Sequence, residues 1–271
     1  MVEMPRLAVR LGDIAYALLR RIQLPVYEKY LLSKLKDGPV PRHIGVILDG
    51  NRRFARSLGL DLVEGYRLGA KKVREILEWC DQLGIKHITL YAFSTENFSR
   101  PPDQVEAVFS VIREEMQRLL NQLDELERRG IRVRVIGRLD LIPPDMRELA
   151  EKIERATESF GEKTVNIALA YGGRAEIIDA VRKLAELVKE GKLDPEDIDE
   201  KTFENFLYLK DIPDPDLIIR TSGEERISNF LLWHAAYSEL YFMEAYLPTL
   251  RRVDFLRAIR DYQRRQRRYG R

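Results

Sequence analysis

The sequence predicts an α/β fold in which a central parallel sheet is flanked by helices. Short apolar runs alternate along the chain with longer segments of helical periodicity, which is the pattern of strand–helix–strand units. The apolar runs show no regular polar alternation, as is typical of parallel strands buried on both faces. No linker, repeat or low-complexity tract divides the 271 residues, and 45% of them are hydrophobic. We therefore expect one large domain.

Strands and helices are expected in a repeated β-then-α order. The strands are expected at residues 43–48, 87–93, 131–136, 164–171 and 216–219. The helices are expected at residues 64–83, 104–129, 144–160, 175–190, 200–209 and 253–268. Open parallel sheets bind ligands at the carboxyl ends of their strands, so the loops after these strands are where functional residues should lie.

Residues 1–40 precede the first expected strand and predict an N-terminal amphipathic helical extension. Its apolar and basic residues interleave at helical spacing: Leu7, Leu11, Ile14, Leu18, Leu19 and Ile22 with Arg6, Arg10, Arg20 and Arg21. The apolar runs fall short of the roughly 20 residues that span a bilayer, and no cleavable signal pattern is present. We expect a cytoplasmic protein whose extension either lies on a membrane surface or packs on its own body or a partner.

A turn rich in arginine and hydroxyl groups directly follows the fifth expected strand. The segment 220–233 opens with Arg220 and also holds Arg226 and three hydroxyl side chains. Guanidinium groups bind phosphate oxygens bidentately, and hydroxyls fill the remaining acceptor positions. The turn therefore suits a diphosphate. The alternative is a surface turn whose arginines pair with Glu224 and Glu225.

The loop after the first strand brings one carboxylate and two arginines together. Its residues are Asp49, Gly50, Asn51, Arg52, Arg53, Phe54 and Ala55. Glycine permits close approach of the backbone to a ligand, and a carboxylate at a strand end suits a divalent cation. The alternative is that Asp49 or Asn51 caps a following helix.

A third polar loop follows the strand at 87–93. It holds hydroxyls, an amide and an arginine: Ser94, Thr95, Asn97, Ser99 and Arg100. Because three strand ends share this chemistry, we expect them to converge on one site. The turn Gly172-Gly173-Arg174 after the fourth strand is left without a role, since a glycine pair there is ordinary turn chemistry.

These loops, together with Ser238–Phe242, resemble the signature blocks of the cis-prenyltransferases, the undecaprenyl/dehydrodolichyl diphosphate synthase family. The resemblance extends from His43 to Gly270, with the blocks in the order typical of that family. It implies a catalytic domain at residues 41–271, in which a six-stranded parallel sheet and its helices enclose an apolar tunnel. By this resemblance a minority of the apolar stripe on the helix at 104–129 lines the tunnel. The stripe is Val105, Val108, Phe109, Ile112, Met116, Leu119, Leu120 and Leu123.

The resemblance also implies the reaction and the roles of the site residues. Isopentenyl diphosphate units would be condensed onto an allylic diphosphate primer of farnesyl or geranylgeranyl type. The product would be a long Z-polyprenyl diphosphate, the precursor of a glycosyl carrier lipid. Mg²⁺ is the implied cofactor, held by Asp49 and Glu239, and Asn97 helps to remove the proton from the isopentenyl unit. An amide is a weak base, so Asn97 would act as a relay or an orienter.

Further residues are implied to bind the two diphosphate substrates. They are Gly50, Asn51, Arg52, Arg53, Phe54, Tyr66, Ser94, Thr95, Glu96, Phe98, Arg100, Arg220, Arg226, Ile227, Ser228, Arg268 and Gly270. Two positions depart from the bacterial pattern, which has histidine at Tyr66 and arginine at Leu62. We expect the primer or its affinity to differ, with Tyr66 or Arg67 as a partial substitute.

The C-terminal residues imply a homodimer. Arg268 and Gly270 match an Arg-x-Gly motif that, in the family, reaches into the diphosphate site of the neighbouring subunit. The tail is strongly basic, but the formal net charge of the chain is only +2 and no nucleic-acid recognition motif is present. We expect no nucleic-acid partner.

Two rival functions are weighed against the synthase. A non-catalytic partner subunit of a heteromeric enzyme would keep the fold and the tail, but the retention of Asp49, Asn97 and Arg220 argues against it. An aspartate-nucleophile phosphatase would need a second acid two residues after Asp49, where the chain has Asn51, a poor general acid. The Asp-Asp-x-x-Asp pattern of trans-prenyl synthases is also absent.

Overall fold

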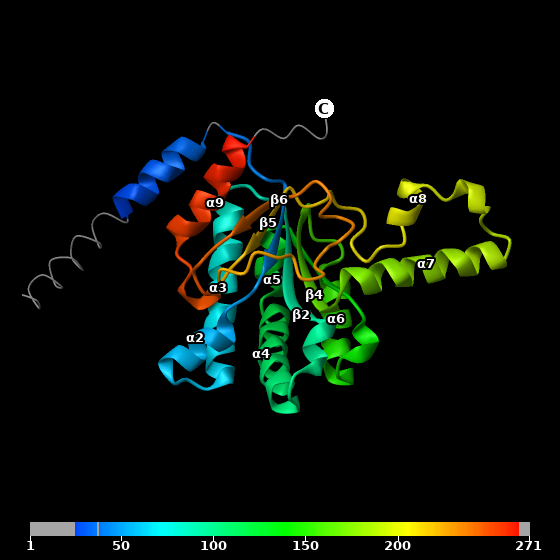
Figure 1. Ribbon diagram of the computed structural model, residues 1–271, viewed down its shortest axis with the longest axis horizontal. Coiled ribbons are helices and arrows are strands. Elements are labelled where there is room, and N and C mark those ends of the chain that lie inside the picture. Colours follow the sequence, from blue (N-terminus) through cyan, green and yellow to red (C-terminus); the bar gives the residue numbers. More distant parts are fainter. Residues whose placement is uncertain (1–24, 37, 266–271) are drawn as a thin grey trace, which may run out of the picture. The chain divides into compact units, whose positions relative to one another are not determined.

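The computed structural model describes residues 25–36 and 38–265, and its centre is a sheet of six parallel strands (Figure 1). The strands are β1 (His43–Ile47), β2 (His87–Ser94), β3 (Ile131–Ile136), β4 (Lys163–Tyr171), β5 (Leu217–Arg220) and β6 (Glu239–Phe242). Their order across the sheet is β3-β4-β2-β1-β5-β6. The predicted six-stranded parallel sheet is confirmed, and each of the five strands predicted by residue range ends within one residue of its expected bounds.

Helices connect the strands, and they differ from the prediction at several places, among them α2, which was not expected. The helices are α2 (Asn51–Leu58), α3 (Leu62–Gln82), α4 (Pro102–Leu120), α5 (Leu123–Arg128), α6 (Pro144–Thr157), α7 (Gly173–Lys189), α8 (Glu200–Glu204) and α9 (Arg252–Arg264). The single helix expected at 104–129 is two helices, because Gln122 leaves the helical conformation with φ −120°. The helix expected at 200–209 ends at Glu204. The helical spacing of apolar residues in the segment 104–129 continues across the break between α4 and α5, so this spacing could not reveal the break.

The strands are buried because they carry apolar side chains on both faces. All five residues of β1 are buried. Consecutive residues of a strand point to opposite faces, so Val135 packs in one core cluster and Ile136 in the other. The first cluster joins the sheet to α4, α5 and α6, and the second joins it to Leu209 and Phe230. The sheet therefore has a hydrophobic core on each side.

Strand order places the polar loops side by side. β1 lies between β2 and β5, and Ile47 pairs with Arg220 in register. The chain leaves β1 toward β2 on one side and returns to β5 on the other, which makes the carboxyl end of β1 a topological switch point. Open α/β sheets bind ligands in the crevice at such points, and the loops at Asp49 and Thr221 both open there.

The chain divides into two compact units. The larger comprises Pro41–Leu250 and contains the sheet. The other contains a helix at residues 25–35 together with α9, joined by an ion pair between Arg252 and Glu28 at 2.7 Å and a hydrogen bond from Gln263 Nε2 to the Leu35 carbonyl. The amphipathic pattern predicted from Leu7 to Ile22 lies outside the described residues. No helix within residues 25–36 and 38–265 has the length and apolarity needed to cross a membrane.

Candidate active site

Arg220, the last residue of β5, is the centre of the site. Its side chain is 6% exposed, and its guanidinium donates from Nη2 to Asp49 Oδ2 at 2.8 Å. From Nη1 it donates to Ser228 Oγ at 2.7 Å and to the carbonyl of Arg226 at 2.5 Å. One buried side chain thus ties together the loops after β1 and β5. The surface-turn alternative is wrong for Arg220.

Asp49 is held ionised although it is partly buried. Burial by itself would raise the pKa of this carboxyl, but hydrogen bonds from Arg220 and the Gly50 N–H, together with the Arg220 charge, outweigh it, so the pKa lies below its usual value. Arg53 adds a second guanidinium 3.5 Å away. The Asp49 side chain is 30% exposed, which leaves carboxylate surface for a ligand.

The amino end of α2 lies beside Asp49, at the same site. Gly50 precedes the helix with φ 103°, and no side chain caps the first turn, so the capping role considered for Asp49 and Asn51 is wrong. The first N–H groups of a helix lack intrahelical partners and favour an anion. Arg53 extends from this turn and pairs with Glu224 at 3.0 Å. Arg52 donates to Gln104 at 2.9 Å.

The loop after β2 forms the third side of the site as a short 3₁₀ helix, Thr95–Ser99. The carbonyl oxygen of the Asn97 side chain accepts from the Ser94 N–H at 3.1 Å. Because a backbone N–H needs an acceptor, this contact fixes the orientation of the amide and leaves its NH₂ group as the free end. Asn97 therefore offers donors rather than a base, which favours the orienting role.

Glu96 is fixed by a residue from the loop after β5. Asn229 Nδ2 donates to Glu96 Oε1 at 2.6 Å. Burial would raise the pKa of Glu96, but hydrogen bonds, including that from Asn229, lower it below its usual value. The loops after β2 and β5 are thereby joined, as those after β1 and β5 are joined by Arg220.

Arg100 and Tyr66 complete the mouth. Burial lowers the pKa of Arg100 below its usual value, with the neighbouring charge of Arg52 acting in the same direction. Burial also raises the pKa of Tyr66 above 10, against the opposing charge of Arg100. Tyr66 Oη is buried and has no hydrogen-bond partner in the described part of the chain. Arg67 instead pairs with Glu114, Nε to Oε2 at 2.9 Å, and does not line the site.

The loop that carries Ser228 is held in an unusual backbone conformation. Ser222, Ser228, Asn229 and Leu231 have φ values of 79°, 48°, 63° and 46°, in the left-handed region that L-residues rarely adopt. Such conformations cluster at functional sites, where surrounding contacts enforce them. Here the enforcing contacts include those of Arg220 with Ser228 and of Asn229 with Glu96.

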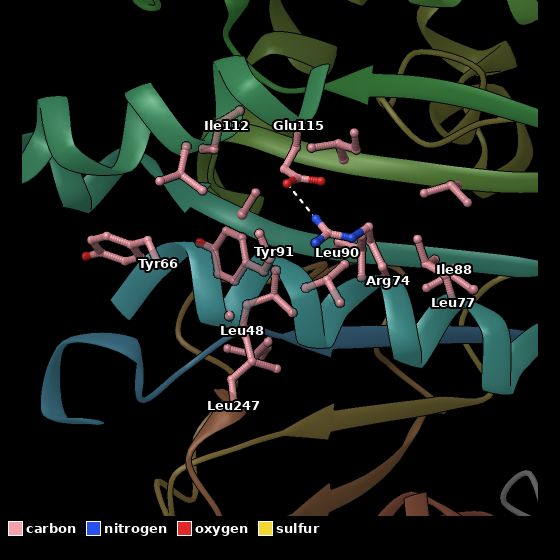
Figure 2. A pocket seen from close by; sticks show the side chains of 18 of the residues that line it. Leu48, Tyr66, Arg74, Leu77, Ile88, Leu90, Tyr91, Ile112, Glu115 and Leu247 are labelled. Carbon is pink, nitrogen blue, oxygen red and sulfur yellow. Dashed lines mark hydrogen bonds and ion pairs between the residues drawn. The ribbon is translucent and has the colours of Figure 1, made fainter. Parts of the chain in front are cut away.

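A cavity of about 1130 Å³ extends from these polar groups into the apolar interior between α3, α4 and the sheet. Figure 2 shows Tyr66 toward one end, Leu77 and Ile88 toward the other, and Leu90 and Tyr91 between them. The predicted site residues that line it are Asp49, Gly50, Asn51, Arg52, Arg53, Tyr66, Ser94, Glu96, Asn97, Arg100, Arg220 and Ser228. The predicted apolar tunnel is therefore present and begins at the converging loops.

Some predicted residues lie elsewhere. The ones that the structure describes but that do not line the cavity are Phe54, Thr95, Phe98, Arg226, Ile227 and Glu239. Phe98 lines a small neighbouring hollow, and Arg226 is largely exposed and pairs with Glu224. Arg268 and Gly270 lie outside the described residues. Of the apolar stripe, half lines the cavity rather than a minority: Val108, Ile112, Met116 and Leu119.

A protein-family model described as "Putative undecaprenyl diphosphate synthase" matches residues 47–270. The chain belongs to this family, the cis-prenyltransferases. It is thus a transferase of prenyl groups, as the resemblance predicted.

Curated relatives of this prenyltransferase share about half of its residues. The protein of Methanopyrus kandleri is 54% identical over 91% of this chain and 90% of its own length. That of Thermococcus kodakarensis is 53% identical over 90% of this chain and 92% of its own. Both are named "Tritrans,polycis-undecaprenyl-diphosphate synthase (geranylgeranyl-diphosphate specific)".

Two solved structures share the fold of the prenyltransferase. Lavandulyl diphosphate synthase from Lavandula x intermedia, in complex with dimethylallyl diphosphate, superposes with a TM-score of 0.81 at 34% identity, covering 86% of this chain and 99% of that one. A probable undecaprenyl diphosphate synthase from Campylobacter jejuni gives 0.70 at 32% identity, with 86% and 100% covered. Because these two enzymes are named for different products, the shared fold does not by itself determine the product.

The expected pairing of Asp49 with Glu239 at one metal is not formed within one chain of the prenyltransferase. Glu239 pairs with Leu217, which pairs with Ile44, so it lies level with a residue five positions before Asp49. At about 3.3 Å per residue, that is roughly 16 Å along the strand direction. The strand order, which the sequence did not reveal, causes this separation. Glu239 as a metal ligand stays a prediction.

The sequence analysis assigned no role to three residues of the site: Asn229, Gly172 and Gly69. Asn229 connects Glu96 to the Arg174 N–H, and a side chain at Gly172 would collide with Asn229 and Thr95 at 2.8 and 2.6 Å. The turn Gly172-Gly173-Arg174, which had no assigned role, thus accommodates the side chain of Asn229. Gly69 lies against Asn51, whose Oδ1 would be 2.2 Å from an added Cβ. A glycine in the sequence can indicate a close approach of another group, but the groups that approach Gly172 and Gly69 are distant in sequence and could not be identified from it.

Proposed function

We propose that this prenyltransferase adds isopentenyl diphosphate units to geranylgeranyl diphosphate and makes a long Z-polyprenyl diphosphate of the undecaprenyl type. The observation that carries the proposal is a cavity with arginines and a carboxylate at its mouth and mostly hydrocarbon side chains, with some charged ones, along its interior. A prenyl diphosphate has the same division of polar head and apolar tail. The names of the curated relatives support the choice of primer and product. Service of the product as a glycosyl carrier lipid is part of the proposal.

The amino end of α2 is proposed to bind the diphosphate of the primer. Its N–H groups and Arg53 offer donors to phosphate oxygens, and Arg52 and Arg100 add positive charge. The tail of the primer would then extend past Tyr66 into the cavity. Bound in this way, the primer would have the C–O bond that must break beside Asp49, at the mouth.

Asp49 is proposed to hold Mg²⁺ together with substrate diphosphate oxygens. The fit is supported by an ionised, partly exposed carboxylate, because Mg²⁺ is usually bound by one or two carboxylates plus phosphates. No cluster of three or more His, Cys, Asp or Glu side chains among the described residues offers a metal site without substrate. When bound there, Mg²⁺ would neutralise charge that develops on the departing diphosphate.

The loop after β5 is proposed to bind isopentenyl diphosphate. Ser228 lines the cavity, and Arg226 provides an exposed guanidinium for the phosphates once it releases Glu224. Arg220 orients this loop. Asn97 would orient the isopentenyl unit while a carbon–carbon bond forms and the allylic C–O bond breaks. The proton lost from that unit would pass to the released diphosphate.

We further propose a homodimer in which Arg268 and Gly270 of one subunit complete the diphosphate site of the other. The resemblance of the tail to the family's Arg-x-Gly motif is the support. Contact of the N-terminal extension with a membrane surface is proposed on its amphipathic sequence pattern alone.

The test is a product analysis of the purified chain with isopentenyl diphosphate, Mg²⁺ and, separately, geranyl, farnesyl and geranylgeranyl diphosphates. Wild type is expected to prefer the geranylgeranyl primer and give long Z-polyprenyl products, and Asp49→Ala is expected to give none. Products of one or two added units would contradict the long-chain proposal. No product with any primer from a folded dimer would instead favour a non-catalytic partner subunit.

A further inference from the structure

A hydrogen bond between two side chains connects loops that belong to non-adjacent strands. Asn229 Nδ2, in the loop after β5, donates to Glu96 Oε1, in the loop after β2, at 2.6 Å, and both residues line the cavity. Strands β2 and β5 each pair with β1, so two strand spacings, or about 10 Å, separate them. Backbone hydrogen bonds of a sheet cannot connect loops at that distance, so side chains must do it.

Asn229 is held by the amino end of α7. Its side-chain oxygen accepts from the Arg174 N–H at 2.9 Å, and its backbone carbonyl accepts from the Gly173 N–H at 2.7 Å. These N–H groups belong to the first turn of the helix, which has no intrahelical acceptors for them. Because the side-chain oxygen is occupied in this way, the NH₂ group of the amide is directed at Glu96. The position of Glu96 is thereby fixed from α7.

The two hydrogen-bonded residues are each next in sequence to a residue of the proposed isopentenyl diphosphate site. Asn97 follows Glu96, and Ser228 precedes Asn229. One substrate molecule must reach both Asn97 and Ser228, and a displacement of about 1 Å in such a site can lower the rate about a hundredfold. A second, longer contact acts on the same loop, since Tyr91 Oη donates to the Ser228 carbonyl at 3.3 Å.

We propose that Asn229 and Glu96 are a positioning pair that sets the spacing between the two ends of the isopentenyl diphosphate site. The proposal rests on the proposed function and gives Glu96 a different role from the implied one, because its carboxylate accepts from Asn229 instead of binding substrate. A positioning pair needs one donor and one acceptor, and either residue can supply either. A carboxylate that binds substrate would have to stay at position 96.

The test exchanges the two groups by combining Glu96→Gln with Asn229→Asp. In the double variant the amide at position 96 donates to the carboxylate at position 229, which still accepts from the Arg174 N–H. Asn and Asp both tolerate the positive φ of this position, 63°, so the exchange adds little backbone strain. The KM for isopentenyl diphosphate is expected to stay within about threefold of wild type.

The single variants differ in whether the hydrogen bond survives. Asn229→Asp places two carboxylates against each other, so the KM for isopentenyl diphosphate is expected to rise at least about tenfold and the KM for the primer less than about twofold. Glu96→Gln keeps an acceptor for Asn229, and its KM values are expected to stay within about threefold of wild type. A tenfold loss in Glu96→Gln that the exchange does not restore would overturn the proposal.

The matched control is Asn121→Asp. It makes the same change from amide to carboxylate at an exposed position that does not line the cavity. A carboxylate at the carboxyl end of α4 should lower stability slightly and leave both KM values unchanged. A rise in the KM for isopentenyl diphosphate as large as that in Asn229→Asp would mean that lowered stability is the cause, and would overturn the proposal.

Equilibrium binding distinguishes failure of this proposal from failure of the proposed function. The chain is saturated with a slowly ionising thiolo analogue of geranylgeranyl diphosphate and titrated with isopentenyl diphosphate and Mg²⁺ in a calorimeter. Wild type and the exchanged variant are expected to bind with similar affinity, and Asn229→Asp at least about tenfold more weakly. Equal affinity in all three would overturn the positioning role alone. Absence of binding to wild type would overturn the proposed function as well.

Discussion

Arg220 is more constrained than a phosphate-binding arginine needs to be. Three of its contacts are to the protein itself: Asp49, Ser228 and the carbonyl of Arg226. A planar guanidinium can reach all three at once, whereas the compact ammonium of lysine cannot. Its proposed part in catalysis is therefore to position other groups.

The substitution Arg220→Lys is expected to reduce kcat strongly and to lower the free energy of unfolding by about 1–3 kcal/mol, because buried partners lose hydrogen bonds. Arg226→Lys, at an exposed position, should raise the KM for isopentenyl diphosphate and change stability by less than about 0.5 kcal/mol. Steady-state kinetics and chemical denaturation measure both. Similar effects of the two substitutions on stability would contradict the positioning role.

Residues of the site differ in how far sequence could predict them. Asp49, Asn97 and Arg220 lie at the ends of apolar strands or within three residues of them, so local order was sufficient to place them at this site. Asn229 could not be assigned a role, because its partner Glu96 is 133 residues away in sequence. The separation of Glu239 from Asp49 depends on which strand neighbours which, and a sequence without strand order does not contain that information.

Helix α2 is the element that shows best how local backbone geometry serves the site. Both ends carry a glycine in the left-handed conformation, Gly50 with φ 103° and Gly59 with φ 66°. An added Cβ at Gly50 would lie 2.8 Å from the Tyr246 ring and 3.0 Å from the Tyr246 Cα, whereas nothing lies within 4 Å at Gly59. A substitution at either glycine introduces backbone strain, but only a substitution at Gly50 also introduces steric crowding. Comparing the two positions therefore distinguishes the two effects.

Replacement of either glycine by alanine should cost about 1 kcal/mol of stability through backbone strain. Gly50→Ala should also displace the proposed diphosphate-binding end of α2 and raise the KM for the allylic primer, while Gly59→Ala leaves it unchanged. Primer titrations of the two variants make the comparison. An unaltered KM in Gly50→Ala would exclude this helix end from primer binding.

At the scale of elements the prediction succeeded where hydrophobic pattern and turn chemistry agree. Strands β2 to β5 are bounded by polar or glycine residues, and β1 is followed by Leu48 and then Asp49, so the limits of all five were found to within one residue. The break between α4 and α5 was missed because only Gln122 departs from helical geometry while the apolar repeat persists. Helix α2 was missed because its sequence is mostly polar and a single residue of it, Ala55, is buried.

For the whole molecule, two buried histidines predict how stability changes with pH. Burial lowers the pKa of His43 to about 4. Burial also acts to lower that of His234, but hydrogen bonds and charges of Asp214 and Glu176 raise it to about 9. From an unfolded value near 6.5, His43 loses stability as the pH falls toward 4. His234 contributes fully below about 6.5, and its contribution is lost as the pH rises through 9.

Thermal unfolding should therefore be most resistant near pH 6.5, with His234 accounting for a loss on the order of 2–3 kcal/mol toward pH 9. His234→Asn should flatten the alkaline side of the profile and leave the acidic side unchanged. Melting temperatures from pH 4 to 9.5 provide the measurement. An alkaline loss that persists in the variant would assign it to other groups.

The proposed dimer can be tested by complementation. Asp49→Ala chains and Arg268→Ala chains are each expected to be nearly inactive. When the two are co-expressed, half of the dimers should be mixed and hold one intact site, which restores about a quarter of wild-type activity. If the tail served its own subunit, no activity would return. Size-exclusion chromatography confirms that each variant still forms dimers.

The contacts of Arg220 have a consequence for how this family can diverge. A descendant that gives up catalysis can discard a group that serves substrate alone. It cannot discard Arg220 so freely, because the same guanidinium fills a buried position between two strand ends. Loss of activity by drift should therefore begin at Asn97 or Arg226. Selection for folding alone would preserve Arg220 and its contacts even in a protein that has lost catalysis. An inactive descendant is therefore better recognised by changes in its exposed loops than by its buried arginine.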